Sequence, residues 1–187
     1  MVSILSLWLP ILVSTVLVFF ASWAIHMFLT YHRSDFSGVP SEDDVRESLG
    51  KFNIPPGDYM IPHCSSGNAM KDEAFMKKME EGPVALVTVM KNGPWNMGSS
   101  LAQWFIYCLV VSVLAAYIAG AALPEGAHYM KVFQIAGCTA FIGYAVALAQ
   151  NSIWYAKKWS STLKSMLDGL IYSLLTAGVF GWLWPGI

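Results

Sequence analysis

Four polar side chains that could do chemistry lie in or beside long apolar runs of this chain. Asp168 is the only acid within any such run, and His26, Gln150 and Asn151 are expected at a similar depth. Ionisable residues inside a membrane are costly and by default indicate function. One interpretation is therefore a polar pocket, or a proton-linked site, that opens to the cytoplasm. The other is that His26, Gln150 or Lys164 holds Asp168 and locks the helices together; we favour this second interpretation at the sequence level.

A second group of potential ligands falls between the first two apolar runs. It comprises Met60, His63, Cys64, Met76 and Met79. Sulfur ligands together with imidazole would suit Cu(I). Methionine, however, is also an ordinary filler of irregular contacts, and a single adjacent His–Cys pair is not a ligand set. The sequence therefore predicts no metal site and no cofactor.

The sequence carries no signature of a known catalytic site. It lacks a Gly-rich phosphate loop, a paired-histidine zinc motif and a nucleophile elbow. The three cysteines, Cys64, Cys108 and Cys138, form no CxxC pair, and two of them lie in apolar runs. His32, beside Arg33, is interpreted as half of an interfacial polar pair. We therefore predict a protein that is not an enzyme.

The composition indicates a membrane protein. Hydrophobic residues make up 56% of the 187 residues and charged residues only 12%, about half the charged share of a soluble domain. The formal net charge of −1 gives no reason to expect a nucleic-acid partner. Four apolar runs approach the length that a bilayer requires. They are 5–29, 100–123, 132–150 and 163–184.

The positions of the basic residues predict how these runs are threaded. Two connections hold nearly all the basic residues: the one between the first and second runs and the one between the third and fourth. Every Lys and Arg except Lys131 lies in one of these connections or next to it. Cytoplasmic loops carry the excess of basic residues, so both connections are predicted to be cytoplasmic and both termini periplasmic. Four short-looped helices with interfacial Trp are similar to many small bacterial inner-membrane proteins, and we expect that location.

The predicted fold class is an all-α integral membrane protein with four transmembrane helices and a small α+β cytoplasmic insertion between helices 1 and 2. The predicted domains are 1–31 for helix 1, 32–98 for the insertion and 99–187 for helices 2–4. Within the insertion we predict a helix capped by Ser41, a second helix over 69–81, and strands at 59–61 and 84–90 that pair.

Small residues recur along one face of helices 2, 3 and 4. Such faces let membrane helices approach closely, because burial of apolar surface gains nothing over lipid. The predicted packing residues are Ser112, Ala116 and Gly120 on helix 2, Ala136, Ala140, Gly143 and Ala147 on helix 3, and Ser165, Gly169, Ser173, Ala177 and Gly181 on helix 4.

A four-helix bundle has few internal seams, so one of these faces could remain for a partner. The sequence thus favours a non-catalytic accessory or scaffold subunit. Its expected partners are the lipid bilayer and either a larger membrane complex, respiratory or photosynthetic by analogy, or further copies of itself. The alternative is a small solute, ion or proton-linked carrier that uses the cluster of His26, Gln150, Asn151 and Asp168.

Overall fold

The structure, a computed structural model, describes residues 1–64 and 72–186 and is mostly helical. It contains four helices that are long and apolar enough to cross a membrane, as the composition predicts, and a small two-stranded sheet. The chain divides into two compact units. One joins Met1–Phe36 to the chain from Asn96 onward and holds all four long helices; the other is Ser37–Trp95.

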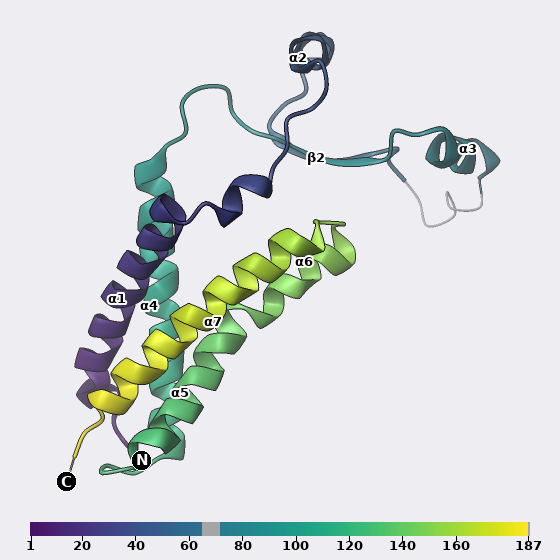
Figure 1. Cartoon of the computed structure of the whole chain (residues 1–187). Coiled ribbons are helices and arrows are strands. Elements are labelled where there is room, and N and C mark those ends of the chain that lie inside the picture. The colour runs from purple at the N-terminus through teal and green to yellow at the C-terminus, as the bar shows by residue number, and fades with distance from the viewer. Residues whose placement is uncertain (65–71, 187) are drawn as a thin grey trace. The chain divides into compact units, whose positions relative to one another are not determined.

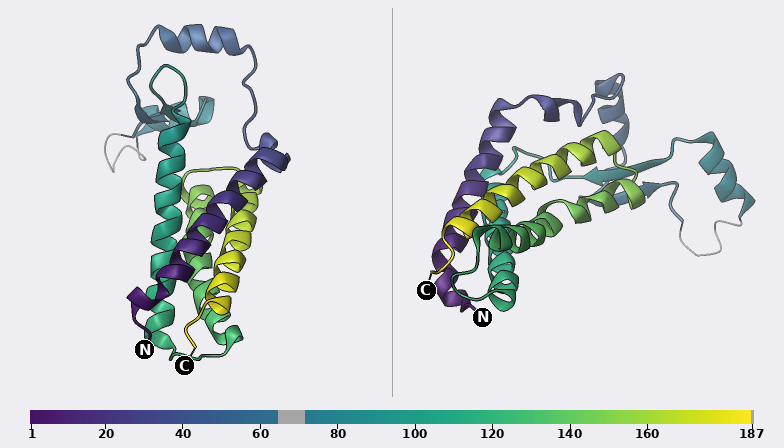
Figure 2. Two further views of the ribbon diagram at one scale, coloured as in Figure 1. Left: turned by 90° about the vertical axis from the view of Figure 1, so that its left-hand side faces the viewer. Right: turned by 60° about the horizontal axis from the view of Figure 1, so that its bottom comes forward.

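The helical unit is built from four helical segments and one short helical turn. Its elements are η1 (Ile4–Leu7) leading into α1 (Trp8–Phe28), η2 (Tyr31–Ser34), α4 (Met97–Ala122), α5 (Tyr129–Tyr144) followed by η4 (Val146–Leu148) and α6 (Ala149–Trp154), and α7 (Trp159–Trp182). Helices α1 and α5 each contact both α4 and α7. Figure 1 shows α5 and α7 side by side, and Figure 2 shows the N- and C-terminal ends of this unit at the same end of the bundle.

Helix α7 approaches α5 through its glycines and small residues. A Cβ atom built on Gly169 would stand 2.8 Å from the Tyr144 carbonyl oxygen, and one on Gly181 would stand 2.6 Å from the Tyr129 ring. On the facing helix, a Cβ on Gly137 would stand 2.9 Å from the Ala177 methyl group. The absence of side chains at these positions is what permits the close packing. The small-residue face of α7 is thus occupied within the chain.

The other small residues singled out in the sequence lie at varied depths. Buried positions are Ser112, Ala116, Gly120, Ala136, Ala140, Gly169, Ser173 and Ala177, whereas Gly143, Ser165 and Gly181 are half-buried. Gly120 faces the backbone of Val2, and Gly143 faces the Val111 side chain. Ala147 is exposed, because it lies in η4, where the third long segment changes its helical geometry.

This interruption differs from the single continuous helix expected over 132–150. Helix α5 ends at Tyr144, and Ala145 leaves the α-helical region with φ −125° and ψ −51°. The Gly143 carbonyl, near this point, accepts a 2.6 Å hydrogen bond from the Tyr107 hydroxyl of α4. The change of helical geometry thus lies next to Gly143 and to this contact with α4.

The second unit contains two short helices and the sheet. Its elements are α2 (Glu42–Gly50), β1 (Gly57–Ile61), α3 (Glu73–Glu81) and β2 (Ala85–Val89). The strands pair antiparallel, with Gly57 opposite Val89 and Ile61 opposite Ala85, which confirms the predicted pairing.

The starts of both helices differ from the sequence prediction. Ser41 has a left-handed backbone (φ 49°) and makes no capping hydrogen bond, since an N-cap side chain needs extended backbone geometry. Helix α3 is capped instead by Asp72, whose carboxylate accepts from the Ala74 amide at 3.0 Å. Residues 69–71 of the predicted second helix lie outside the described residues.

Candidate functional site

The centre of the candidate site is the carboxylate of Asp168, which projects from α7 and is only 3% exposed. The Tyr31 hydroxyl donates a hydrogen bond to its Oδ1 atom. Its Oδ2 atom lies 2.7 Å from His32 Nε2. Both partners belong to η2, which directly follows α1. A buried carboxylate needs such donors, because desolvation without them is strongly unfavourable.

His32 bridges two carboxylates. Its Nε2 atom faces Asp168, and its Nδ1 atom lies 2.6 Å from Asp35 Oδ2. Both ring nitrogens therefore face carboxylate oxygens, an arrangement that favours the protonated imidazolium. Burial alone would lower the pKa of His32, but the hydrogen bonds to Asp35 and Asp168 outweigh it and raise that pKa.

Lys164 fastens η2 to α7. Its Nζ atom lies 2.6 Å from the Tyr31 carbonyl oxygen, 2.7 Å from Ser34 Oγ and 3.0 Å from Asp35 Oδ1. Burial would raise the pKa of Asp35, yet the hydrogen bonds from His32 and Lys164 lower it to about 2. Asp35 is therefore ionised at neutral pH, and the ion pair is formed.

His26 stands beside this network at the last turn of α1. Its Nδ1 atom lies 2.9 Å from the Ser22 carbonyl oxygen, which can only accept, so Nδ1–H is the donor of this hydrogen bond. The His26 and His32 rings are nearly parallel, 5° apart with their centroids at 4.9 Å. One potential ligand atom from each of His26, His32 and Asp168 lies within 4.8 Å of the other two.

A cavity of about 860 Å³ adjoins this cluster. Its wall includes His26 and Asp168, and most of the rest is aromatic or aliphatic. The lining residues are Phe19, Ser22, Trp23, His26, Met27, Met97, Ser100, Leu101, Gln103, Trp104, Tyr107, Tyr144, Leu148, Ser165, Asp168 and Tyr172. An apolar cavity with a few convergent polar groups is the usual form of a small-molecule site.

Tyr172 is the one lining residue whose polar atom is buried without a partner. The side chain is 4% exposed, and its hydroxyl has no hydrogen-bond partner among the described residues. By contrast, the Trp104 indole N–H donates to Ser22 Oγ at 2.7 Å. A buried polar group without a partner is unfavourable by about 1–3 kcal/mol, and a bound ligand could supply the missing partner.

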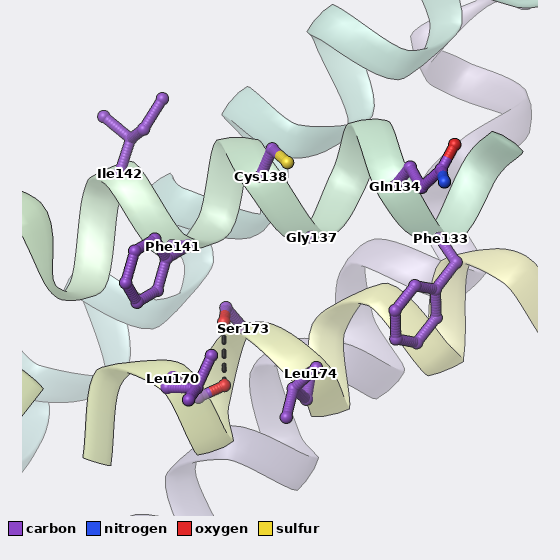
Figure 3. A pocket seen from close by; sticks show the side chains of 9 residues that line it. All are labelled: Phe133, Gln134, Gly137, Cys138, Phe141, Ile142, Leu170, Ser173 and Leu174. Atoms are coloured by element: carbon purple, nitrogen blue, oxygen red, sulfur yellow. Dashed lines mark hydrogen bonds between the residues drawn. The ribbon is translucent and has the colours of Figure 1, made fainter. Parts of the chain in front are cut away.

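A second hollow of about 410 Å³ lies between α5 and α7. Figure 3 shows that Gln134 and Cys138 point away from α7, while Phe133, Phe141 and Leu174 line the gap between the two helices. The Ser173 hydroxyl is already bonded to the Leu170 carbonyl at 2.7 Å. The other polar side chains at this hollow are those of Gln134 and Cys138, and the rest of its lining is apolar.

The structure brings together only two of the four polar residues singled out in the sequence. His26 and Asp168 both line the large cavity, but Gln150 is exposed and neither it nor Asn151 lies in the cavity wall. Asn151 instead accepts backbone hydrogen bonds through its carbonyl group. Lys164 pairs with Asp35 rather than with Asp168.

Sequence reasoning missed the segment that supplies most partners of Asp168. Tyr31 and His32 come directly after the first apolar run, and Asp35 follows His32 by three residues. The His–Asp spacing in a helical turn was a usable signal, because residues i and i+3 are neighbours. His63, Cys64 and the nearby methionines belong to the Ser37–Trp95 unit.

His26, His32 and Asp168 form a possible metal-ligand group, because their ligand atoms converge. Among the described residues, no other group of three His, Cys, Asp or Glu side chains does so. These residues come from the end of α1, from η2 and from α7. Comparison with protein-family models, with curated proteins and with solved structures finds no match to this chain.

Proposed function

We propose that this protein is a small membrane carrier that takes a small solute or ion into the cavity beside Asp168. The observation that carries the proposal is the buried Asp168 carboxylate in the wall of the 860 Å³ cavity. An ionisable residue within an apolar bundle is costly. Its placement in a cavity wall, rather than in a sealed contact between helices, supports a ligand-binding role.

The interrupted third helix agrees with this proposal. Broken helices beside a polar site are typical of carriers, where irregular backbone lines a cavity. Here Tyr144 and Leu148, at the two ends of the interruption, both line the cavity. The site thus combines an apolar chamber, a polar end wall and a local break in one helix.

The geometry supports the carrier better than the accessory-subunit hypothesis. That hypothesis depended on a small-residue face being left for a partner. Gly137, Gly169 and Gly181 instead contact neighbouring helices of the same chain. These three glycine positions are therefore not available for contact with a helix of another protein.

We further propose that the chain lies in a bacterial inner membrane with residues 37–95 in the cytoplasm. Green fluorescent protein inserted at Gly38, which is exposed with open space around it, should fluoresce. Alkaline phosphatase fused to the C-terminus should be active, because that reporter requires the periplasm. Both outcomes are expected because the basic residues are concentrated in the connections that the proposal places in the cytoplasm. If a C-terminal fusion to green fluorescent protein fluoresces and the Gly38 insertion does not, the protein has the opposite orientation.

Transport can be tested on the full chain in proteoliposomes. Charge movement on a supported membrane is recorded while a panel of inorganic cations, organic cations and small anions is applied. At least one member should give a current above that of empty liposomes. Asp168→Asn should reduce that current at least tenfold, because the amide removes the anionic acceptor of both Tyr31 and His32.

The matched control is Asp43→Asn, which alters a carboxylate that is 97% exposed in the other unit. Its current should equal that of the unmodified protein. Thermal unfolding of each variant in detergent reports whether it is folded. His26→Gln, a change at an exposed cavity residue, gives a second test that keeps both hydrogen-bond partners of Asp168, Tyr31 and His32. A folded protein that moves no member of the panel would refute the carrier.

A further inference from the structure

We propose that His26, His32 and Asp168 bind a divalent transition-metal ion of the Zn²⁺ type. The ligand atoms that converge are the imidazole nitrogens of the two histidines and a carboxylate oxygen, all within 4.8 Å. Two imidazoles with one carboxylate form a common three-ligand set for zinc and for non-haem iron. The proposal that the cluster binds a metal ion does not depend on the proposed function. The further idea that this ion is the one carried across the membrane rests on it.

Each of the three ligands is already oriented by a second hydrogen bond. The Nδ1–H group of His26 is held by the Ser22 carbonyl, and that of His32 by the Asp35 carboxylate. Oδ1 of Asp168 accepts from the Tyr31 hydroxyl. His32 Nε2 and Asp168 Oδ2 bond to each other at 2.7 Å, and a shared ion would take the place of the proton between them, with Nε2 of His26 as its third ligand. A carboxylate or carbonyl behind each ligating histidine is the usual support of a metal site.

Coordination of a shared ion requires His26 to rotate out of its parallel stack on His32, because the Nε2 lone pair lies in the plane of each ring. His32 Nε2 and Asp168 Oδ2 are 2.7 Å apart, so the longest separation involves His26. Ligand atoms of a tetrahedral zinc ion stand roughly 3.4 Å apart at the usual bond lengths. Coordination therefore separates His32 from Asp168 slightly and draws His26 inward. His26 is exposed at the cavity edge and has room to turn.

The charge of the cluster favours a cation. A metal ion that binds His32 Nε2 replaces the proton there, which leaves for solvent, so both imidazoles are then neutral. The carboxylates of Asp35 and Asp168 remain, opposed by the single ammonium group of Lys164. Once that proton has left, these protein groups carry a net negative charge, which stabilises the bound divalent cation.

The cluster leaves the ion accessible from the cavity. Three protein ligands leave a fourth position of a tetrahedral site open, and both His26 and Asp168 lie in the cavity wall. Two imidazole ligands disfavour the hard ions Mg²⁺ and Ca²⁺, which prefer all-oxygen sites. The chemistry thus selects Zn²⁺, or a similar ion such as Co²⁺, over the alkaline-earth ions.

Metal binding is tested on the full chain in detergent after removal of bound metal with a chelator. Equilibrium dialysis against Zn²⁺ should give one ion per chain, and Co²⁺ should develop the visible absorption bands of a tetrahedral site. Excess Mg²⁺ should not displace either ion. His26→Ala and Asp168→Asn should each weaken Zn²⁺ binding at least 100-fold. Asp35→Asn weakens the support of His32 and also removes the ion pair with Lys164; it should weaken Zn²⁺ binding about 10- to 100-fold.

The matched control is His128→Ala, because His128 caps α5 and its ring accepts from the Met130 amide. Zn²⁺ affinity should be unchanged in this variant. Equal Zn²⁺ affinity in the unmodified protein, His26→Ala and Asp168→Asn would overturn the proposal, as would loss of binding only in His63→Ala. One bound Zn²⁺ without any transport current refutes the carrier alone, whereas transport of another solute without Zn²⁺ binding refutes the metal site alone.

Discussion

Gly169→Ala is expected to destabilise the helical unit by about 1–3 kcal/mol, the usual cost of overpacking. The new methyl group would lie 2.8 Å from the Tyr144 carbonyl oxygen and 2.9 Å from the Ala145 methyl group. The oxygen belongs to backbone at the end of α5, so no flexible side chain can move aside. Helices α5 and α7 must separate to accept the substitution.

The same change at Gly178, on the same helix, is the matched control. A Cβ atom there would meet only the Tyr129 hydroxyl, at 3.9 Å. Alanine in a helix interior is favoured over glycine by roughly 0.5–1 kcal/mol, so Gly178→Ala should be neutral or slightly stabilising. Unfolding by sodium dodecyl sulfate in mild-detergent micelles, followed by far-UV circular dichroism, measures both. Equal stability of the two variants would contradict the close approach at Gly169.

Lys164→Met should lower the free energy of unfolding by about 2–4 kcal/mol and should release η2 from α7. The substitution keeps the aliphatic stem but removes the ammonium group that contacts Tyr31, Ser34 and Asp35. The Asp35 side chain is only 12% exposed. Removal of one partner from this half-buried ion pair leaves an uncompensated charge with little access to water, which is why the effect exceeds that of a surface pair.

Hydrogen exchange can localise the effect of Lys164→Met. The amides of Arg33 and Asp35 donate to the Thr30 and His32 carbonyls within η2, and their exchange should become faster when this turn detaches. Lys157→Met removes an exposed lysine in the connection before α7 and should change neither stability nor exchange. Unaltered exchange at Arg33 and Asp35 in Lys164→Met would show that Lys164 does not hold η2.

Some features followed from local sequence because their cause is local. The four long helices were predictable, since a run of about 20 apolar residues favours a membrane-spanning helix whatever other segments it packs against. The pairing of Gly57–Ile61 with Ala85–Val89 was anticipated from β-branched content and turn residues.

The candidate site was only partly predictable. Asp168 and His26 stood out because polar residues in apolar runs are rare, and the two do share the cavity. Gln150 appeared equivalent to them by depth, but the interruption at Ala145 and its own exposure keep it out of the cavity wall. Depth along a helix does not fix the direction in which a side chain points.

The sequence by itself determined that four long apolar helices form, that a short α+β segment follows the first, and that one acid lies within an apolar run. Only the tertiary structure decided that this acid meets His32, 136 residues away in the chain, and that Lys164 belongs to Asp35. It also decided that Tyr107 and Gly169 meet α5 where its helix ends. Hydropathy and helical period show how a single segment interacts with lipid or water. The contacts depend instead on which faces of separate helices come together.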